Sequence, residues 1–270
     1  MSSTATQSGP APWRQTFLDH LSKMSSPELM LSTLTAAPSG SSTSHLPRAR
    51  TCIYRGMWTE LPENKHNPAE KNERVFGSDM PTITTDVRME KVGQITGTGE
   101  EETGKEGSGG GGRVEAVWWI KEGDVMTQWR VKGEAFVIGP DVGEDGNEGV
   151  KMVKTELGKR MRTVNEGQQA DWSWEKELTA HFGNLSPMMR GSFKAPSPGM
   201  PKGEPFDDKK YVSGQKVEDL HDPVARENFR LVVIRPDEVE QLYLGEPKFF
   251  RYRYTYQEDS GDWKKVELWP

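Results

Sequence analysis

The chain has 270 residues, of which 33% are hydrophobic, with 28 glycines, 18 prolines and a formal net charge of −6. This length suits one sizeable domain, and the composition indicates an ordered core interrupted by solvated insertions. The acidic balance argues against a nucleic-acid partner, because binding a polyanion relies on clustered Lys and Arg. The five histidines are scattered along the sequence, so no metal site is predicted.

No apolar run approaches the roughly 20 residues that a membrane-spanning helix needs, so no membrane partner is expected. The N-terminal stretch MSSTATQSGPAPWRQ lacks a basic start followed by an apolar segment, which makes secretion improbable. The single cysteine, Cys52, has no internal partner for a disulfide. Together these features favour a reducing, cytoplasmic location.

The first predicted element is a helix in PWRQTFLDHLSKM, where Trp13, Phe17, Leu21 and Met24 recur at helical spacing on one face. A loop rich in Ser and Pro, AAPSGSSTSHLP, comes later in the chain. Alternating polar and apolar residues then predict a series of strands: RTCIYRGMW, PTITT, VEAVWWI, VMTQWRVKGEAFVIG, NFRLVVIRP, KFFRYRYTYQ and WKKVELW. Many strands and few long helices indicate a mainly β (α+β) protein, an antiparallel barrel or sandwich with accessory helices.

Two insertions are expected to interrupt this series and to contribute nothing to the core. Residues 96–113, TGTGEEETGKEGSGGGGR, have the composition of a flexible linker. The second, near 139–170, begins with an acidic loop, GPDVGEDGNEG. The prediction is therefore a single domain over 10–270, preceded by a disordered N-terminus at 1–9.

The first insertion contains GEEETGKE, from Gly99 to Glu106, which nearly matches the phosphate-binding GxxxxGK[ST] loop. Glu106 stands where a hydroxyl should hold magnesium, and the three preceding glutamates would repel phosphate. A solvated linker is the better interpretation.

The segment ITTDVRMEKV predicts a strand that leads directly into a charged helix start. Thr85 or Asp86 would cap this helix, and Arg88 and Lys91 would lie on one of its faces beside an N-terminus that favours anions. This arrangement suits a phosphate. The alternative is a solvated face on which Glu90 pairs with the two cations.

The order of several segments supports the phosphate interpretation. RTCIYRG, TDVRMEK, TQWRVKG, RPDEVEQLYLGEPKFFRYRYTYQ and WKKVELWP follow one another as in a known family. The chain resembles the FMN-binding split-barrel flavoproteins related to pyridoxamine 5'-phosphate oxidase, in the branch whose motif is close to TDxRSxK. The resemblance runs from APWRQTF to the last residue and excludes the two insertions.

The resemblance implies an antiparallel split β-barrel and FMN as cofactor. It assigns to FMN binding eight residues: Arg50, Arg55, Thr84, Thr85, Arg88, Lys91, Gln128 and Arg251. Strand alternation places Arg50 and Arg55 on opposite faces unless the strand bends. Met89 stands where this branch usually has Ser.

The resemblance also implies a homodimer with FMN at the subunit interface and an oxidoreductase that acts on a small molecule. Pyridoxamine 5'-phosphate oxidases hold their substrate with an Arg and a His, but here Lys248, Phe249 and Phe250 stand in that stretch. The substrate is therefore unidentified, and no catalytic acid or base is named. The alternatives are a non-catalytic FMN-binding module or sensor, and an interaction scaffold with an empty site.

Aromatic residues and a second helix start complete the predictions. Trp118, Trp119 and Trp129 could border the flavin, although core packing is the better interpretation for aromatic residues in strands. LSPMMRG predicts a helix with Ser186 as cap and Pro187 as its first residue. Two basic residues follow this helix start, Arg190 and Lys194. They either contact an anionic substrate or are exposed charges.

Overall fold

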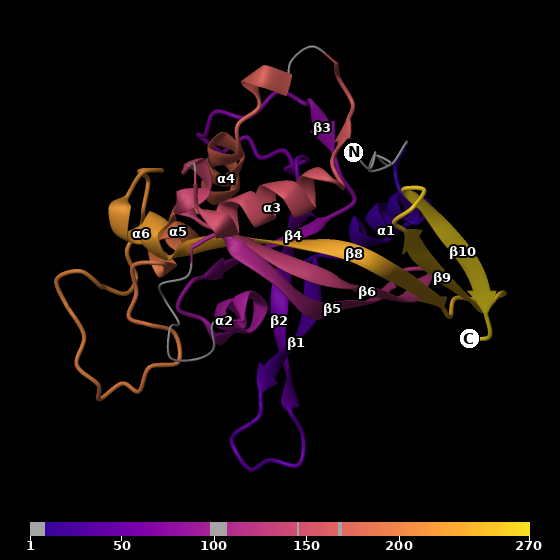
Figure 1. The fold of residues 1–270 in the computed structure, drawn as a ribbon, viewed down its shortest axis with the longest axis horizontal. Helices are drawn as coiled ribbons and strands as arrows, with labels where there is room; N and C mark the ends of the chain where they lie inside the picture. Colours follow the sequence, from indigo (N-terminus) through magenta and orange to yellow (C-terminus); the bar gives the residue numbers. More distant parts are fainter. Residues whose placement is uncertain (1–8, 98–106, 145, 167–168) are drawn as a thin grey trace.

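A computed structural model describes residues 9–97, 107–144, 146–166 and 169–270. Its centre is an eight-stranded antiparallel sheet in the order β10-β9-β8-β4-β2-β1-β5-β6 (Figure 1). The strands of this sheet are β1 (Glu28–Ala36), β2 (His45–Met57), β4 (Pro81–Asp86), β5 (Gly109–Glu122), β6 (Val125–Ile138), β8 (Phe229–Tyr243), β9 (Phe250–Gln257) and β10 (Asp262–Leu268). Two short strands, β3 (Phe76–Gly77) and β7 (Arg162–Thr163), pair separately.

Strand β8 closes the barrel. It pairs with β6 over most of its length and so joins the two ends of the order β8-β4-β2-β1-β5-β6. Its other edge is shared, because β4 pairs with its first residues and β9 pairs with its last. The register shifts where Gly133 faces Pro236, since proline cannot donate a ladder hydrogen bond. The predicted antiparallel split barrel is confirmed.

The helices lie around this barrel (Figure 1). They are α1 (Arg14–Leu21), α2 (Glu90–Thr96), α3 (Glu148–Gly158), α4 (Trp174–Gly183), α5 (Pro187–Ser192) and α6 (Pro223–Asn228), with short 3-10 turns at Pro140–Gly143 and Gln169–Asp171. The predicted start of α5 is confirmed, because the Ser186 side chain accepts from the Met189 amide and Pro187 is the first helical residue. Within the described ranges, no helix is long and apolar enough to cross a membrane.

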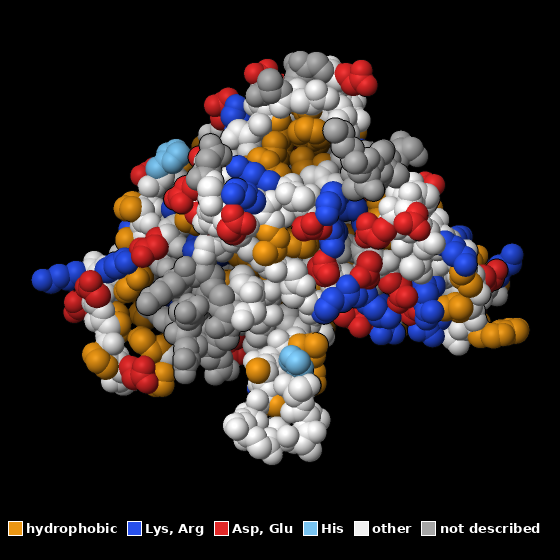
Figure 2. Space-filling model, in the orientation of Figure 1, with side chains coloured by type: hydrophobic (Ala, Val, Ile, Leu, Met, Phe, Trp, Pro, Cys, Tyr) orange, Lys and Arg blue, Asp and Glu red, His pale blue; other side chains and the backbone are white. Residues whose placement is uncertain are grey.

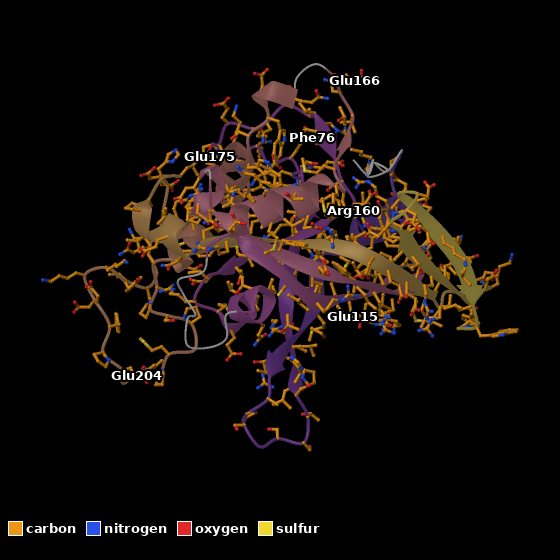
Figure 3. The ribbon with its side chains drawn as sticks, in the orientation of Figure 1. Phe76, Glu115, Arg160, Glu166, Glu175 and Glu204 are labelled. Atoms are coloured by element: carbon orange, nitrogen blue, oxygen red, sulfur yellow. The ribbon has the colours of Figure 1, made fainter. Side chains whose placement is uncertain are left out.

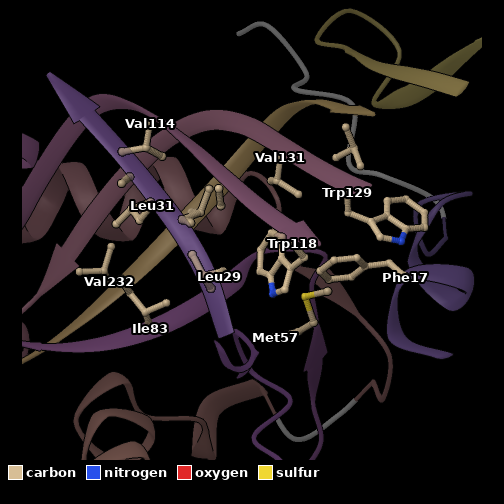
Figure 4. Close-up of a cluster of buried hydrophobic side chains, with 14 of the residues drawn as sticks. Phe17, Leu29, Leu31, Met57, Ile83, Val114, Trp118, Trp129, Val131 and Val232 are labelled. Carbon is tan, nitrogen blue, oxygen red and sulfur yellow. The ribbon is translucent and has the colours of Figure 1, made fainter. Parts of the chain in front are cut away.

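The barrel interior forms the first core. Leu29, Ile83, Trp118 and Trp129 are fully or almost fully buried there (Figure 4). Helix α1 adds Phe17, whose ring contacts both tryptophans edge to face at 5.0 and 5.4 Å between centroids. Each such side chain stabilises the fold by roughly 1.5 to 3 kcal/mol through burial. The predicted apolar face of the first helix is therefore confirmed.

A second core lies between the outer side of the sheet and the helices α3, α4 and α6. Phe136, Leu231 and Val233 from the strands pack there with Val153 and Leu157 of α3. The prediction that the insertion near 139–170 contributes nothing to the core was wrong. The sequence of α3 has an apolar residue about once per turn, but the acidic residues in front of it hid this helix in a composition-based interpretation.

The glycine run at the end of the first insertion is also structured. Residues 109–112 begin β5 and pair with β6. A β-carbon on Gly110 would lie 2.5 Å from the Ala135 carbonyl oxygen, and one on Gly112 would lie 2.6 Å from that of Ile95. These glycines permit close backbone contact, so the linker prediction was wrong for them. Gly99–Glu106 and the predicted disordered residues 1–8 lie outside the described residues.

Candidate functional site

The segment ITTDVRMEKV forms the end of β4 and the start of α2, as predicted, but the helix begins later than expected. Its first residue is Glu90, and its N-cap is Met89, whose side chain makes no capping hydrogen bond. The predicted cap at Thr85 or Asp86 was therefore wrong. Arg88 precedes the helix, so Arg88 and Lys91 do not share a helical face.

Arg88 has its guanidinium enclosed by partners. It pairs with Asp86 at 2.7 Å and donates to the carbonyl oxygens of Ala195 at 3.0 Å and Phe193 at 3.4 Å. Its guanidinium carbon also lies 5.1 Å from the centroid of the Tyr211 ring. These contacts fasten the segment after α5 to the barrel. Asp86 accepts from Arg88 instead of capping α2.

Lys91 lies on α2 in a buried position, with 6% of the residue exposed. Its ammonium donates to the Thr85 hydroxyl at 2.9 Å and lies 3.5 Å from the sulfur of Met89. Burial lowers the pKa of Lys91, and the charge of Arg50 opposes its protonation as well. In the described part of the chain, Lys91 forms no ion pair.

Arg50 lies on β2 near Lys91. It donates to the Thr33 hydroxyl at 2.6 Å and to the Gln94 amide oxygen at 2.8 Å. Burial lowers the pKa of Arg50. Burial raises the pKa of the Cys52 thiol, although Lys91 and Arg50 both act in the opposite direction. Arg50, Cys52, Thr85 and Lys91 thus form one group, which we call the cation cluster.

Arg55 and Thr84 lie on the opposite face from the cation cluster. The Arg55 guanidinium donates to the Thr84 hydroxyl at 3.3 Å and lies 3.7 Å from the sulfur of Met189 on α5. It also lines a cleft of about 600 Å³ with apolar residues of α1 and β2, among them Leu18 and Met57. The bulge after Tyr54 does not bring the two arginines together. Strand alternation therefore separates Arg50 from Arg55, as the sequence predicted.

Gln128 and Arg251 lie on another part of the barrel. Gln128 pairs with Leu242 on β8, and Leu242 pairs with Arg251 on β9, so both polar residues lie in one row across the sheet. On β8 this row lies at Leu242, near the opposite end of the strand from Arg230, which pairs with Thr85 of the cation cluster. The exposed Trp119, at 49%, belongs to the same row through its pairing with Gln128. We call these residues the β6–β9 row.

Arg251 belongs to a charged strip on β5, β6, β8 and β9. Glu240 on β8 is almost fully buried and accepts from Arg251 at 2.6 Å. Burial by itself would raise the pKa of Glu240, but the hydrogen bond and charge of Arg251 make the net shift downward. Figure 2 shows acidic and basic side chains interleaved in this region, and Glu115, which pairs with Arg130 at 2.6 Å, is labelled in Figure 3.

The other predicted candidates are structural. Trp118 and Trp129 are fully buried in the barrel, as the core interpretation expected, whereas Trp119 is not. Arg190 is 2% exposed, so the expectation of an exposed charge was wrong for it. Lys194 pairs with Asp222 at 2.7 Å.

Sequence reasoning missed Thr33 and Gln94, whose side chains hold Arg50 in place. Thr33 lies on β1, a strand that the sequence analysis did not identify, and Gln94 lies three residues after Lys91 on α2. The recurrence of Glu90 and Gln94 at a spacing of four was the available signal for a polar side of α2.

The cation cluster is suited to a phosphate. Two cations, Arg50 and Lys91, are fixed by neutral hydroxyl and amide groups and have no carboxylate partner in the described ranges. A buried charge without a counter-ion is unfavourable, and a phosphate group with almost two negative charges would remove this cost. The donor set therefore fits the phosphate of a nucleotide cofactor.

The fold defines a class, the antiparallel split-barrel proteins. Residues 10–139 match the family model described as pyridoxamine 5'-phosphate oxidase, FMN-binding domain. The resemblance that the sequence motifs indicated is confirmed over this part of the chain, which is similar to that FMN-binding domain.

Solved structures show the same fold. A pyridoxamine 5'-phosphate oxidase-related, FMN binding protein from Nostoc punctiforme PCC 73102 aligns over 97% of this chain and 100% of its own, with 22% identity and a TM-score of 0.58. A protein related to general stress protein 26, of the pyridoxinephosphate oxidase family, from Clostridium acetobutylicum covers 88% of this chain and 92% of its own, at 7% identity and a TM-score of 0.33. No curated protein sequence matches the chain.

Proposed function

We propose that the chain binds FMN and that the cation cluster holds the cofactor phosphate. The observation that carries this proposal is a pair of cations, half-buried Arg50 and buried Lys91, that have no carboxylate partner in the described ranges, with the Thr85 hydroxyl beside Lys91. Charge-assisted hydrogen bonds of this kind contribute roughly 1.5 to 3 kcal/mol each. Three of them, imperfectly additive, would supply about 5 to 9 kcal/mol, enough for affinity between high micromolar and submicromolar.

We infer further that the protein is an oxidoreductase for a small molecule in a reducing, cytoplasmic setting. Bound FMN would supply hydride and electron transfer. The chain would supply binding and orientation: Arg55, which donates to the Thr84 hydroxyl, lines the 600 Å³ cleft and offers a polar contact there. Arg88 would keep the segment after α5 in position through its bonds to Phe193 and Ala195.

The β6–β9 row supports a homodimeric site. Gln128 and Arg251 are predicted to contact FMN, yet they lie beside Leu242, at the other end of β8 from the residue that pairs with Thr85 of the cation cluster. A second copy that offers this row to the cluster would complete the site. Two exposed apolar residues on neighbouring strands, Trp119 of β5 and Met30 of β1, agree with such an interface.

FMN titration tests the cofactor assignment. The protein should bind FMN at least tenfold more tightly than riboflavin, because riboflavin lacks the phosphate. Arg50→Gln should weaken FMN binding and leave riboflavin binding unchanged. Arg48→Gln, on the same strand and exposed, is the matched control and should behave like the wild type. Equal affinity for FMN and riboflavin would contradict the role of the cation cluster.

Mixing two inactive variants tests the shared site. Lys91→Met removes the phosphate cation and Arg251→Gln changes the β6–β9 row, so each homodimer would carry two damaged sites. A mixed dimer would carry one intact site, and FMN binding should return to about a quarter of the sites after equimolar exchange. A mixture that binds no more FMN than either variant alone, although exchange of subunits is demonstrated, would contradict the shared site.

A non-catalytic FMN-binding module is the second candidate, favoured by the replacement of the substrate-binding Arg and His of the oxidases by Lys248, Phe249 and Phe250. Phe249 is 58% exposed, which is compatible with either an interface or a substrate wall. Anaerobic mixing of the FMN-loaded protein with NADH or NADPH distinguishes the two candidates. Loss of the flavin absorption band at a useful rate supports the oxidoreductase, and a flavin that neither donor reduces supports the module.

A further inference from the structure

At the end of β4, each of two neighbouring threonine hydroxyls accepts a hydrogen bond from a basic side chain, and the same basic side chain also contacts a methionine sulfur. On one face, Lys91 contacts the Thr85 hydroxyl at 2.9 Å and the Met89 sulfur at 3.5 Å. On the other, Arg55 contacts the Thr84 hydroxyl at 3.3 Å and the Met189 sulfur at 3.7 Å. The same three-part arrangement therefore occurs on both faces of one strand.

A methionine sulfur is a weak hydrogen-bond acceptor and a poor partner for a cation. Both sulfurs are nevertheless on accessible residues, since Met89 is 36% and Met189 is 42% exposed. Neither cation has a carboxylate partner in the described ranges, so each remains able to bind a stronger acceptor. A chemical change at either sulfur would act directly on the neighbouring cation.

We propose that Met89 and Met189 are sites of oxidation by hydrogen peroxide, and that oxidation of Met89 weakens FMN binding. The thioether sulfur attacks one peroxide oxygen, the O–O bond breaks and an S–O bond forms. The second oxygen leaves as water after a proton shift, so the sulfur loses two electrons and the peroxide gains them. The inference about Met89 rests on the proposed role of Lys91 in binding the cofactor phosphate.

The effect follows from the sulfoxide oxygen. It is a strong acceptor, unlike the sulfur that it replaces, and at Met89 it would be carried by the atom that already lies 3.5 Å from the Lys91 ammonium. It would then compete with phosphate for this cation. At Met189 the same change would affect Arg55 at the cleft, away from the cation cluster.

The test compares FMN affinity before and after treatment with hydrogen peroxide, with peptide mass spectrometry to measure oxidation at each methionine. Wild-type protein should bind FMN about tenfold more weakly once Met89 is oxidised, and methionine sulfoxide reductases should restore its affinity. Met89→Leu should keep its own untreated affinity after the same treatment. Met188→Leu is the matched control, because Met188 is 48% exposed and contacts no cation in the described structure, and it should remain as sensitive as the wild type.

Several results would overturn the inference. If Met89 is fully oxidised and FMN affinity is unchanged, oxidation of Met89 does not weaken FMN binding. If Met89 stays unmodified when Met188 is fully oxidised, Met89 is not an oxidation site. If the Met89→Leu protein loses as much FMN affinity after peroxide treatment as the wild type, another residue is responsible for the sensitivity. Cys52 in the cation cluster would be the next residue to replace. Untreated protein that binds no FMN would contradict the proposed function itself.

Discussion

Replacement of Lys91 by Met should change FMN affinity and the stability of the FMN-free protein in opposite directions. Lys91 is 6% exposed, and within the described ranges the partners of its ammonium are a hydroxyl and a thioether. Removal of one charge-assisted hydrogen bond to phosphate should weaken FMN binding by about 1.5 to 3 kcal/mol. This change corresponds to roughly 10- to 150-fold in Kd.

The apoprotein should respond in the opposite direction. Because burial lowers the pKa of Lys91, the folded state disfavours its charge, and methionine fills a similar volume without one. The FMN-free Lys91→Met protein should therefore be as stable as the wild type or more stable in urea unfolding. Flavin fluorescence quenching at fixed salt and pH 7 measures the affinity of both proteins. Unchanged FMN affinity, or an apoprotein destabilised by several kcal/mol, would refute the reasoning.

Three further changes test the fold around the site. His181 has a pKa lowered from 6.5 to about 3, mainly by burial, so the unfolded state binds more protons between these values. The free energy of unfolding should then fall as pH drops below 6.5, by up to about 1.4 kcal/mol per unit, and His181→Phe should lessen this slope in urea titrations at several pH values. Leu157→Ala should lower the free energy of unfolding by about 2 to 5 kcal/mol if α3 belongs to the second core, whereas an insertion outside the core would lose under about 0.5 kcal/mol. Gly112→Ala should reduce thermal stability and slow assembly of the barrel, because its β-carbon would lie 2.6 Å from the Ile95 carbonyl oxygen, and an unchanged Tm would contradict this contact.

Local sequence patterns determined most of the barrel. Alternating apolar residues identified most of its strands, and helical spacing identified the buried face of α1 with Trp13, Phe17 and Leu21. These features depend on the period of side chains along a single element, so the chain order carries them directly. The separation of Arg50 and Arg55 was predictable for the same reason, because alternation along one strand assigns each residue to a face.

Contacts between distant segments were decided only by the tertiary structure. Composition marked Gly110, Gly112 and the region around α3 as linker, but backbone approach and a second hydrophobic core made them structural. The sequence placed Arg88 beside Lys91, whereas bonds to residues more than a hundred positions away turned Arg88 towards the segment after α5. Partners at such separations leave no periodic trace in the chain. For this reason the residue types at the site were foreseeable, whereas the turn of Arg88 away from Lys91 and the distant position of Gln128 and Arg251 became clear only in three dimensions.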